Sequence, residues 1–128
     1  EAAPTTSEHF WRWRLLMAER IAASMDRAKF GVENLYVLGS TKNASAGPAS
    51  DIDVLVHFKG TPSQLLALQN WLEGWSLCLG ESNYLTTGYE TGGLLDVHII
   101  TDEDIEKHTS WAVKIGAPTD AAKLLPLK

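Results

Sequence analysis

Two aspartates, Asp51 and Asp53, alternate with apolar residues directly behind a run of small and turn-forming residues. The alternation predicts a β-strand over residues 51–58, with one apolar face and one face that carries the carboxylates. Side chains two residues apart in a strand point to the same side, about 6.6–6.8 Å from each other. Because aspartate is depleted in strands, we expect this pair to have a chemical use.

A third carboxylate, Asp96, stands in the middle of a second predicted strand, residues 94–100. If the two strands are neighbours, three carboxylates meet on one face of the sheet. Like charges at that separation raise each other's pKa unless a cation lies between them. Oxygen ligands suit a hard divalent ion, so the pattern predicts Mg²⁺ or Mn²⁺ held by Asp51, Asp53 and Asp96, with substrate phosphates completing the coordination.

Two histidines, His57 and His98, share the carboxylate faces of the predicted strands. Either of them could line the site. Since Mg²⁺ prefers oxygen ligands, we expect them beside the metal ligands or partly exposed.

The segment before the first aspartate has the composition of a phosphate-binding loop. Gly39 lets the backbone approach a ligand closely, and Ser40 offers a hydroxyl and an N–H to a phosphate. Lys42 adds a positive charge, and residues 41–50 are predicted to be a loop that contains Gly47-Pro48. A loop of this kind beside a metal site is what a nucleoside triphosphate requires.

The Gly39-Ser40 pair, the spacer of residues 41–50, the Asp51-Ile52-Asp53 strand and the later Leu95-Asp96-Val97 strand resemble the nucleotidyltransferase superfamily of DNA polymerase beta. The resemblance covers residues 30–100 and is closest to the minimal nucleotidyltransferases, which are similar to the N-terminal domains of aminoglycoside-modifying enzymes. It implies that Ser40 binds the triphosphate, that Asp51 and Asp53 hold the metals, and that Asp96 helps to activate the acceptor hydroxyl.

The implied activity is transfer of a nucleoside monophosphate from a nucleoside triphosphate to an acceptor hydroxyl, with release of pyrophosphate. The resemblance leaves the acceptor open between a small molecule, a protein side chain and an RNA end. The chain departs from the family pattern at one position that is expected to bind phosphate. Many small members carry an arginine soon after the Gly-Ser, whereas this chain continues Thr41-Lys42-Asn43.

Hydrophobic spacing and turn residues divide the chain into the elements that must position these groups. The predicted elements are a helix over 7–30 that stops at Gly31, a strand over 35–38, the strand over 51–58, a helix over 61–77, a hairpin of strands over 84–87 and 94–100, and a short helix from 101.

The order of these elements predicts an α+β fold, with a mixed β-sheet and helices packed on one of its faces. We expect a single nucleotidyltransferase domain over residues 1–128, with its core in 30–100. The segment 109–128 is predicted to be either a docked helix or the beginning of a further domain.

Composition excludes some partners and favours a location. The chain has 11 basic and 16 acidic residues and a net charge of −5, which disfavours long nucleic acid unless a further domain or partner protein supplies the grip. No apolar run has the length of a membrane span. The single cysteine, Cys78, is typical of a reducing compartment, so we expect a cytoplasmic protein that makes no membrane contact.

Two other functions are compatible with the same residues. The domain could be a catalytically weak or inactive nucleotidyltransferase fold that acts as a nucleotide-binding sensor or a scaffold within a larger protein. A hydrolase with Ser40 as its nucleophile is less favoured, because the chain has no Gly-x-Ser-x-Gly motif.

Overall fold

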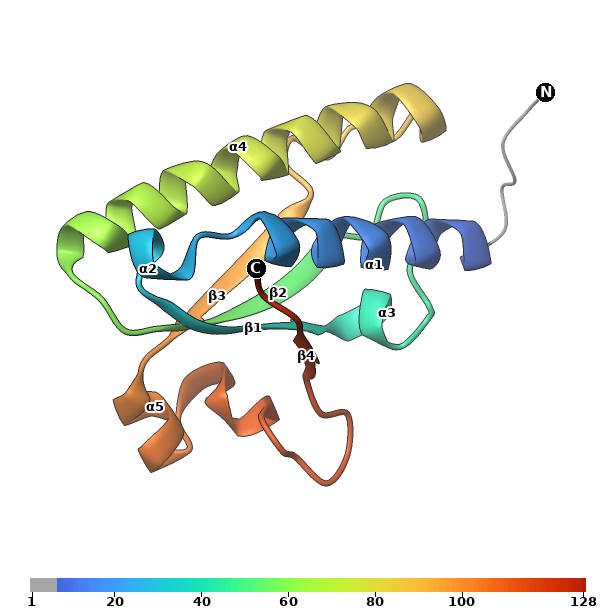
Figure 1. The fold of residues 1–128 in the computed structure, drawn as a ribbon. Helices are drawn as coiled ribbons and strands as arrows, with labels where there is room; N and C mark the ends of the chain where they lie inside the picture. The colour runs from blue at the N-terminus through green and yellow to red at the C-terminus, as the bar shows by residue number, and fades with distance from the viewer. Residues whose placement is uncertain (1–6) are drawn as a thin grey trace.

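The computed structural model describes residues 7–128, and a four-stranded mixed sheet lies at its centre (Figure 1). The strands are β1 (Val32–Leu38), β2 (Ile52–Phe58), β3 (Leu95–Ile100) and β4 (Lys123–Leu125). They lie in the order β3-β2-β1-β4. The β1–β2 and β1–β4 pairs are antiparallel, whereas β2 and β3 are parallel. The α+β fold class predicted from the sequence is therefore confirmed.

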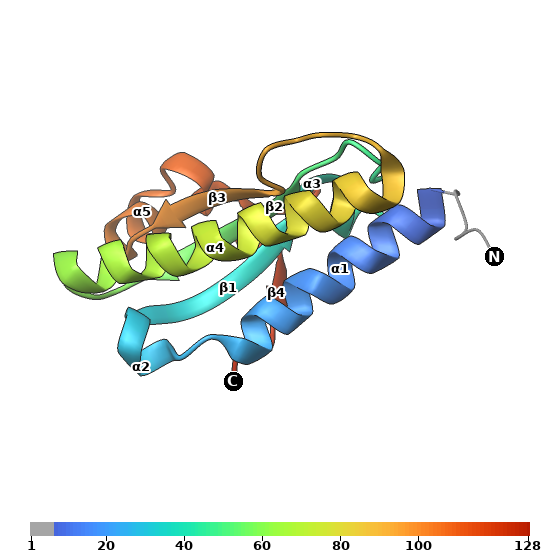
Figure 2. The same ribbon diagram turned by 90° about the horizontal axis from the view of Figure 1, so that it is seen from above.

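Two long helices, α1 (Ser7–Ser24) and α4 (Pro62–Thr87), cover one face of the sheet, as Figures 1 and 2 show. The apolar side chains of β2 at positions 52, 54, 56 and 58 are buried in the core beneath these helices. This matches the alternation read from the sequence, in which one side of β2 is apolar. The carboxylates of β2 and β3 are consequently left on the opposite face.

That opposite face is partly covered by two short elements, α5 (Asp102–Lys107) and the 3₁₀-helix η1 (Ser110–Lys114). A second, smaller core gathers there around Leu38, Leu55, Ile100 and Ala112. Helices thus lie on both sides of the sheet, with the two long ones together on a single face.

The predicted hairpin over 84–100 is wrong, because residues 84–87 belong to α4. A run of Tyr, Leu and Thr favours a strand by propensity, but the Thr86 and Thr87 hydroxyls donate instead to the carbonyls of Ser82 and Asn83 one turn earlier. Gly88, with φ +81°, then ends the helix. Helix α4 is therefore the crossover that a parallel β2–β3 pair requires.

The predicted N-terminal helix over 7–30 is divided in two. Helix α1 ends at Ser24, and a separate turn, α2 (Arg27–Phe30), begins after Asp26. The Asp26 side chain accepts a hydrogen bond from the Lys29 backbone N–H, which starts a new helix at that point. Gly31 stops α2 in the left-handed conformation, as predicted. Part of the predicted 41–50 loop is also helical, in the single turn α3 (Gly39–Lys42).

The segment 109–128 returns to the sheet. After η1 it runs to β4, which pairs with β1 and places Leu125 opposite Leu35. Leu125 is 2% exposed and belongs to the main core. Of the two alternatives predicted for this segment, the docked helix is wrong, because the segment forms a 3₁₀ turn followed by an edge strand. Among residues 7–128, no helix is both long and apolar enough to span a bilayer.

Leu125→Ala should lower the free energy of unfolding by about 2–5 kcal/mol, because it removes a buried side chain from the main core. Leu124→Ala is the matched control, because the Leu124 side chain is 57% exposed. This substitution should change the free energy of unfolding by about 0.5 kcal/mol or less. Urea unfolding of both variants measures the difference. Equal stabilities would show that β4 does not belong to the folded core.

Candidate active site

The parallel register of β2 and β3 places Asp53 directly opposite Asp96. Carboxylate oxygens of these two residues and a ring nitrogen of His98 lie within 4.8 Å of one another. Asp51 precedes β2 and lies outside this group of three, but its charge interacts with that of Asp96. The structure therefore brings the three predicted carboxylates to one end of the β2–β3 pair, with Asp53 and Asp96 in closest association.

The association changes the proton affinity of the carboxyl groups. The pKa of Asp53 is raised from 3.8 to about 6, first by burial and then by the hydrogen bond and charge of Asp96. The pKa of Asp51 is also raised, by burial and by Asp96, while the charge of Arg14 opposes the shift. Both shifts express first the cost of burying a negative charge and then the cost of placing it beside another carboxylate.

Gly39 connects the predicted phosphate loop to the carboxylates. It has φ +71°, in the left-handed region, and a Cβ built on it would overlap Oδ2 of Asp53. Glycine is therefore favoured at this position, because another residue would strain the backbone and displace the carboxylate of Asp53. The contact places the beginning of α3, with Ser40 next in the chain, directly beside the carboxylate of Asp53.

A buried arginine that the sequence analysis missed holds the segment before Asp51. Arg14 of α1 has no exposed surface. Its guanidinium donates to the carbonyls of Ser50 and Pro48, at 2.9 and 3.2 Å, and to Oδ1 of Asn83 in α4, at 2.9 Å. The side-chain amide of Asn83 also donates to Pro48 O at 2.9 Å.

Helices α1 and α4 thus fix the backbone that leads into Asp51. The signal in the sequence was an arginine on the otherwise apolar stripe of α1, at position 14 between Trp13 and Met17. Three of the groups that accept hydrogen bonds from Arg14 belong to Pro48, Ser50 and Asn83, far away in the chain. The pattern of apolar residues in α1 contains no information about these partners.

His98 faces the carboxylates and is held by an aromatic neighbour. Its Nε2 lies 3.5 Å from Oδ2 of Asp96 and 3.9 Å from Oδ1 of Asp53. The indole of Trp111 in η1 lies against the imidazole, with ring centroids 4.1 Å apart and an interplanar angle of 32°. The Nε2 atom is buried, and within residues 7–128 it makes no hydrogen bond.

The other histidine of this face, His57, is engaged elsewhere. Its Nε2 lies 2.6 Å from Oδ1 of Asp102, at the beginning of α5. The contact with His57 is the main reason that the pKa of Asp102 is lowered. Of the two candidate histidines, only His98 therefore joins the cluster with Asp53 and Asp96.

Lys42, the predicted phosphate contact, pairs with the C-terminal segment. Its ammonium lies 3.0 Å from Oδ1 of Asp120, which also accepts from the Asn43 side chain at 2.9 Å. Lys114 contacts the other oxygen of Asp120 at 3.2 Å. These three donors lower the pKa of Asp120. The role of Lys42 in phosphate binding stays a prediction, as do the roles of Gly39 and Ser40.

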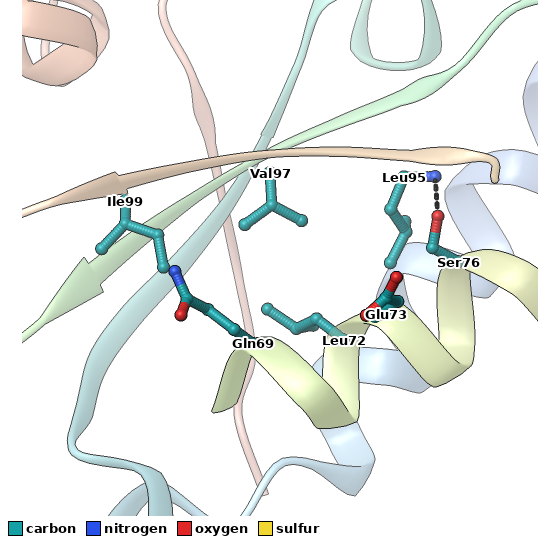
Figure 3. Close-up of a pocket in the computed structure, with 7 residues that line it drawn as sticks. All are labelled: Gln69, Leu72, Glu73, Ser76, Leu95, Val97 and Ile99. Carbon is teal, nitrogen blue, oxygen red and sulfur yellow. Dashed lines mark hydrogen bonds between the residues drawn. The ribbon is translucent and has the colours of Figure 1, made fainter. Parts of the chain in front are cut away.

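A pocket of about 310 Å³ lies on the other face of β3, against α4 (Figure 3). Leu95, Val97 and Ile99 line it from the strand, whereas Asp96 and His98 point to the opposite side. Ser76 of α4 also lines this pocket, and its hydroxyl accepts from the backbone N–H groups of Leu94 and Leu95 at 3.0 Å. The contact ties the beginning of β3 to α4, so this side of β3 sets the position of Asp96.

The donor set of the cluster fits a divalent cation. Two carboxylates and an imidazole nitrogen converge within coordination reach of one point, and the buried Nε2 of His98 lacks a hydrogen-bond partner in the described chain. A cation between the carboxylates would relieve the part of the Asp53 pKa shift that comes from the charge of Asp96. Asp53, Asp96 and His98 are consequently the residues that could hold a metal, with Asp51 beside them.

Comparison with known proteins identifies the family. A family model described as "Nucleotidyltransferase domain" matches residues 20–117, which include the carboxylates and the Gly-Ser turn. The chain belongs to the nucleotidyltransferase domain family.

No curated protein sequence matches this nucleotidyltransferase domain. Among solved structures, the chain is similar to one described as a "putative nucleotidyltransferase from Sulfolobus solfataricus", with 17% sequence identity and a TM-score of 0.44. The match covers 84% of this chain and 85% of the other. The family assignment rests on the family model, over most of the chain.

Arg14→Met should lower the free energy of unfolding by about 2–4 kcal/mol, because the buried Asn83 amide and the half-buried carbonyls of Ser50 and Pro48 lose a charged donor. Arg20→Met on the exposed side of the same helix is the matched control. Urea unfolding tests the pair. A loss no larger than that of the control would show that Arg14 does not anchor the loop.

The metal-free domain should lose stability as pH rises through the range from 3.8 to about 6, relative to Asp53→Asn. The folded state raises the pKa of Asp53, so it binds the proton more tightly than the unfolded chain, and this contribution disappears once the group ionises. The substitution removes that ionisation. As pH rises through this range, the unfolding free energy of Asp53→Asn should therefore gain about 1 kcal/mol on that of wild type, a figure that allows for solvent screening.

Urea unfolding of both proteins in EDTA between pH 4 and 7 measures this difference. Glu73→Gln, an exposed carboxylate of α4 on the other side of the sheet, is the control. A difference between wild type and Asp53→Asn that stays constant with pH would contradict the argued clustering of charge.

Proposed function

We propose that this domain transfers a nucleoside monophosphate from a nucleoside triphosphate to an acceptor hydroxyl and releases pyrophosphate, with Mg²⁺ or Mn²⁺ as the required cation. The observation that carries the proposal is the contact of Gly39 with Asp53, opposite Asp96. This contact places the Gly39-Ser40 turn, which is suited to bind phosphate, beside the aspartate cluster, which is suited to bind a cation. The family resemblance implies both features.

In the proposed reaction the acceptor oxygen forms a bond to the α-phosphorus, and the bond from that phosphorus to the bridging oxygen of the leaving pyrophosphate breaks. Asp51, Asp53 and Asp96 would hold the cation, and the bound cation would neutralise the developing charge on the phosphate oxygens. Ser40, beside Gly39, would bind the triphosphate. Asp96 would orient the acceptor hydroxyl and accept its proton as the new bond forms, before passing it to water. Rate enhancement then comes mainly from positioning and electrostatics.

The acceptor in this proposal is a small molecule or a protein side chain rather than long nucleic acid, since the net charge of the chain is −5. A further domain or partner protein would contribute to acceptor recognition. The single exposed cysteine, Cys78, agrees with the proposed cytoplasmic location.

A second function, nucleotide binding without transfer, is favoured by one observation. The only basic residue of the 39–50 segment, Lys42, is paired with Asp120, and the chain lacks the arginine of many small relatives. Weak phosphate binding of this kind would suit a sensor or a scaffold better than a catalyst.

Asp51→Asn, Asp53→Asn and Asp96→Asn should each lower transfer by about a hundredfold or more while the fold is kept, because each removes a charge from the cation site. Pyrophosphate release is measured with each of the four nucleoside triphosphates and Mg²⁺ or Mn²⁺, with small hydroxyl compounds, protein and RNA as acceptor pools. Glu73→Gln is the control that removes a carboxylate from the other side of the sheet.

Calorimetric titration with ATP and Mg²⁺ separates the two functions. Binding without pyrophosphate release from any triphosphate would favour the sensor or scaffold. Transfer that persists at the wild-type rate in the aspartate variants would overturn the assignment of the cation site, and absence of nucleotide binding would overturn both functions.

Lys42→Ala should weaken binding of ATP and Mg²⁺ about fivefold, which corresponds to about 1 kcal/mol for one charge pair near the protein surface. Lys114→Ala is the matched control, because it also removes a cation from Asp120 but lies outside the phosphate loop. Equal dissociation constants for the two variants would show that Lys42 serves only to hold the C-terminal segment.

A further inference from the structure

The imidazole of His98 occupies a place in the cluster where an oxygen ligand would suit Mg²⁺ better. His98 follows Asp96 by two residues on β3, so the two side chains share a face. Its Nε2 lies 3.5 Å from Asp96 and 3.9 Å from Asp53. In the described chain this atom is buried and makes no hydrogen bond.

We propose that His98 is a nitrogen ligand of the cation site and that it shifts the preference of the site from Mg²⁺ toward first-row transition ions, Mn²⁺ among them. The inference rests on the metal-dependent transfer proposed above and adds the identity of the ion. Imidazole favours transition ions, whereas an all-oxygen set favours Mg²⁺. A site made of Asp53, Asp96 and His98 is therefore mixed in character.

The surroundings of His98 fix the ring for this purpose. Trp111 lies against one face of the imidazole, at 4.1 Å between centroids, and the His98 side chain is 15% exposed. A ring packed in this way loses little further freedom when its nitrogen coordinates a metal. The nitrogen faces two carboxylates that need a positive partner, and a cation shared by all three groups satisfies each of them.

A second reading of the same geometry is a histidine that donates to the carboxylates in place of a metal. In that arrangement His98 competes with the cation, and its removal would strengthen metal binding. Coordination and competition thus predict opposite effects of the same substitution, which makes them separable by experiment.

The test uses Mn²⁺ bound to the untagged protein, observed by pulsed electron paramagnetic resonance for coupling to nitrogen. We expect nitrogen coupling in wild type, with the pattern changed by ¹⁵N-labelled histidine, which requires no substitution and so does not depend on the folding of a variant. Coupling should be kept in His57→Gln, the control histidine bound to Asp102, and lost in His98→Gln and His98→Asn.

Competition between Mn²⁺ and Mg²⁺ gives a second readout. The preference for Mn²⁺ should fall by about tenfold in His98→Gln, because an imidazole ligand contributes more to a transition ion than to Mg²⁺. Three results would overturn the inference about His98 and leave the proposed function standing. They are bound Mn²⁺ without nitrogen coupling in wild type, coupling that survives in both His98 variants, and tighter Mn²⁺ binding in His98→Gln. Absence of any Mn²⁺ and Mg²⁺ binding would overturn the proposed metal-dependent function as well.

Discussion

The pairing of Asp53 with Asp96 across two parallel strands is the constraint on which the site depends. Opposite positions in neighbouring strands bring like charges within a few ångströms of each other, which is destabilising in the absence of a counter-charge. The register is nevertheless set firmly. Apolar side chains of β2 fill the core under α1 and α4, and those of β3 pack against it. A slip of one residue would turn Asp53 into that core.

Much of the surrounding structure holds this charged pair at a fixed place. Ser76 ties the beginning of β3 to α4, and Arg14 ties the loop before Asp51 to α1 and α4. Gly39 lets α3 begin against the carboxylate of Asp53. The aspartates are thus positioned by buried contacts on one side of the sheet, while their charges face the other side, where a cation and a triphosphate are proposed to bind.

The sequence predicted the parts of this arrangement that depend on local pattern. The alternation around Asp53 and Asp96 placed both carboxylates on one side of their strands. The phosphate-binding role of the Gly-Ser turn stays a prediction. The sequence could not predict the parts that depend on distant contacts. Residues 84–87 have strand propensity, yet they continue α4 directly after Asn83, a buried residue of that helix that accepts a hydrogen bond from Arg14.

The same limit applies to the histidines and to Lys42. His57 and His98 have equivalent places in the strand pattern, and only the packing of α5 and η1 separates them, through Asp102 and Trp111 respectively. Lys42 was predicted as a phosphate contact from its place in the loop. Its pairing with Asp120 depends on the return of the C-terminal segment to the sheet, which no local pattern around residue 42 contains.

The most direct measurement of the central claim is a thermal melt of wild type and Asp53→Asn, each in EDTA and in millimolar Mg²⁺ or Mn²⁺. If the aspartates form a cation site, the metal binds only the folded state and raises the melting temperature of wild type by a few degrees. In EDTA, Asp53→Asn should melt above wild type, because one of the repelling charges is gone, and metal should then add little. Melting temperatures that do not change with metal or with the substitution would contradict the existence of the site.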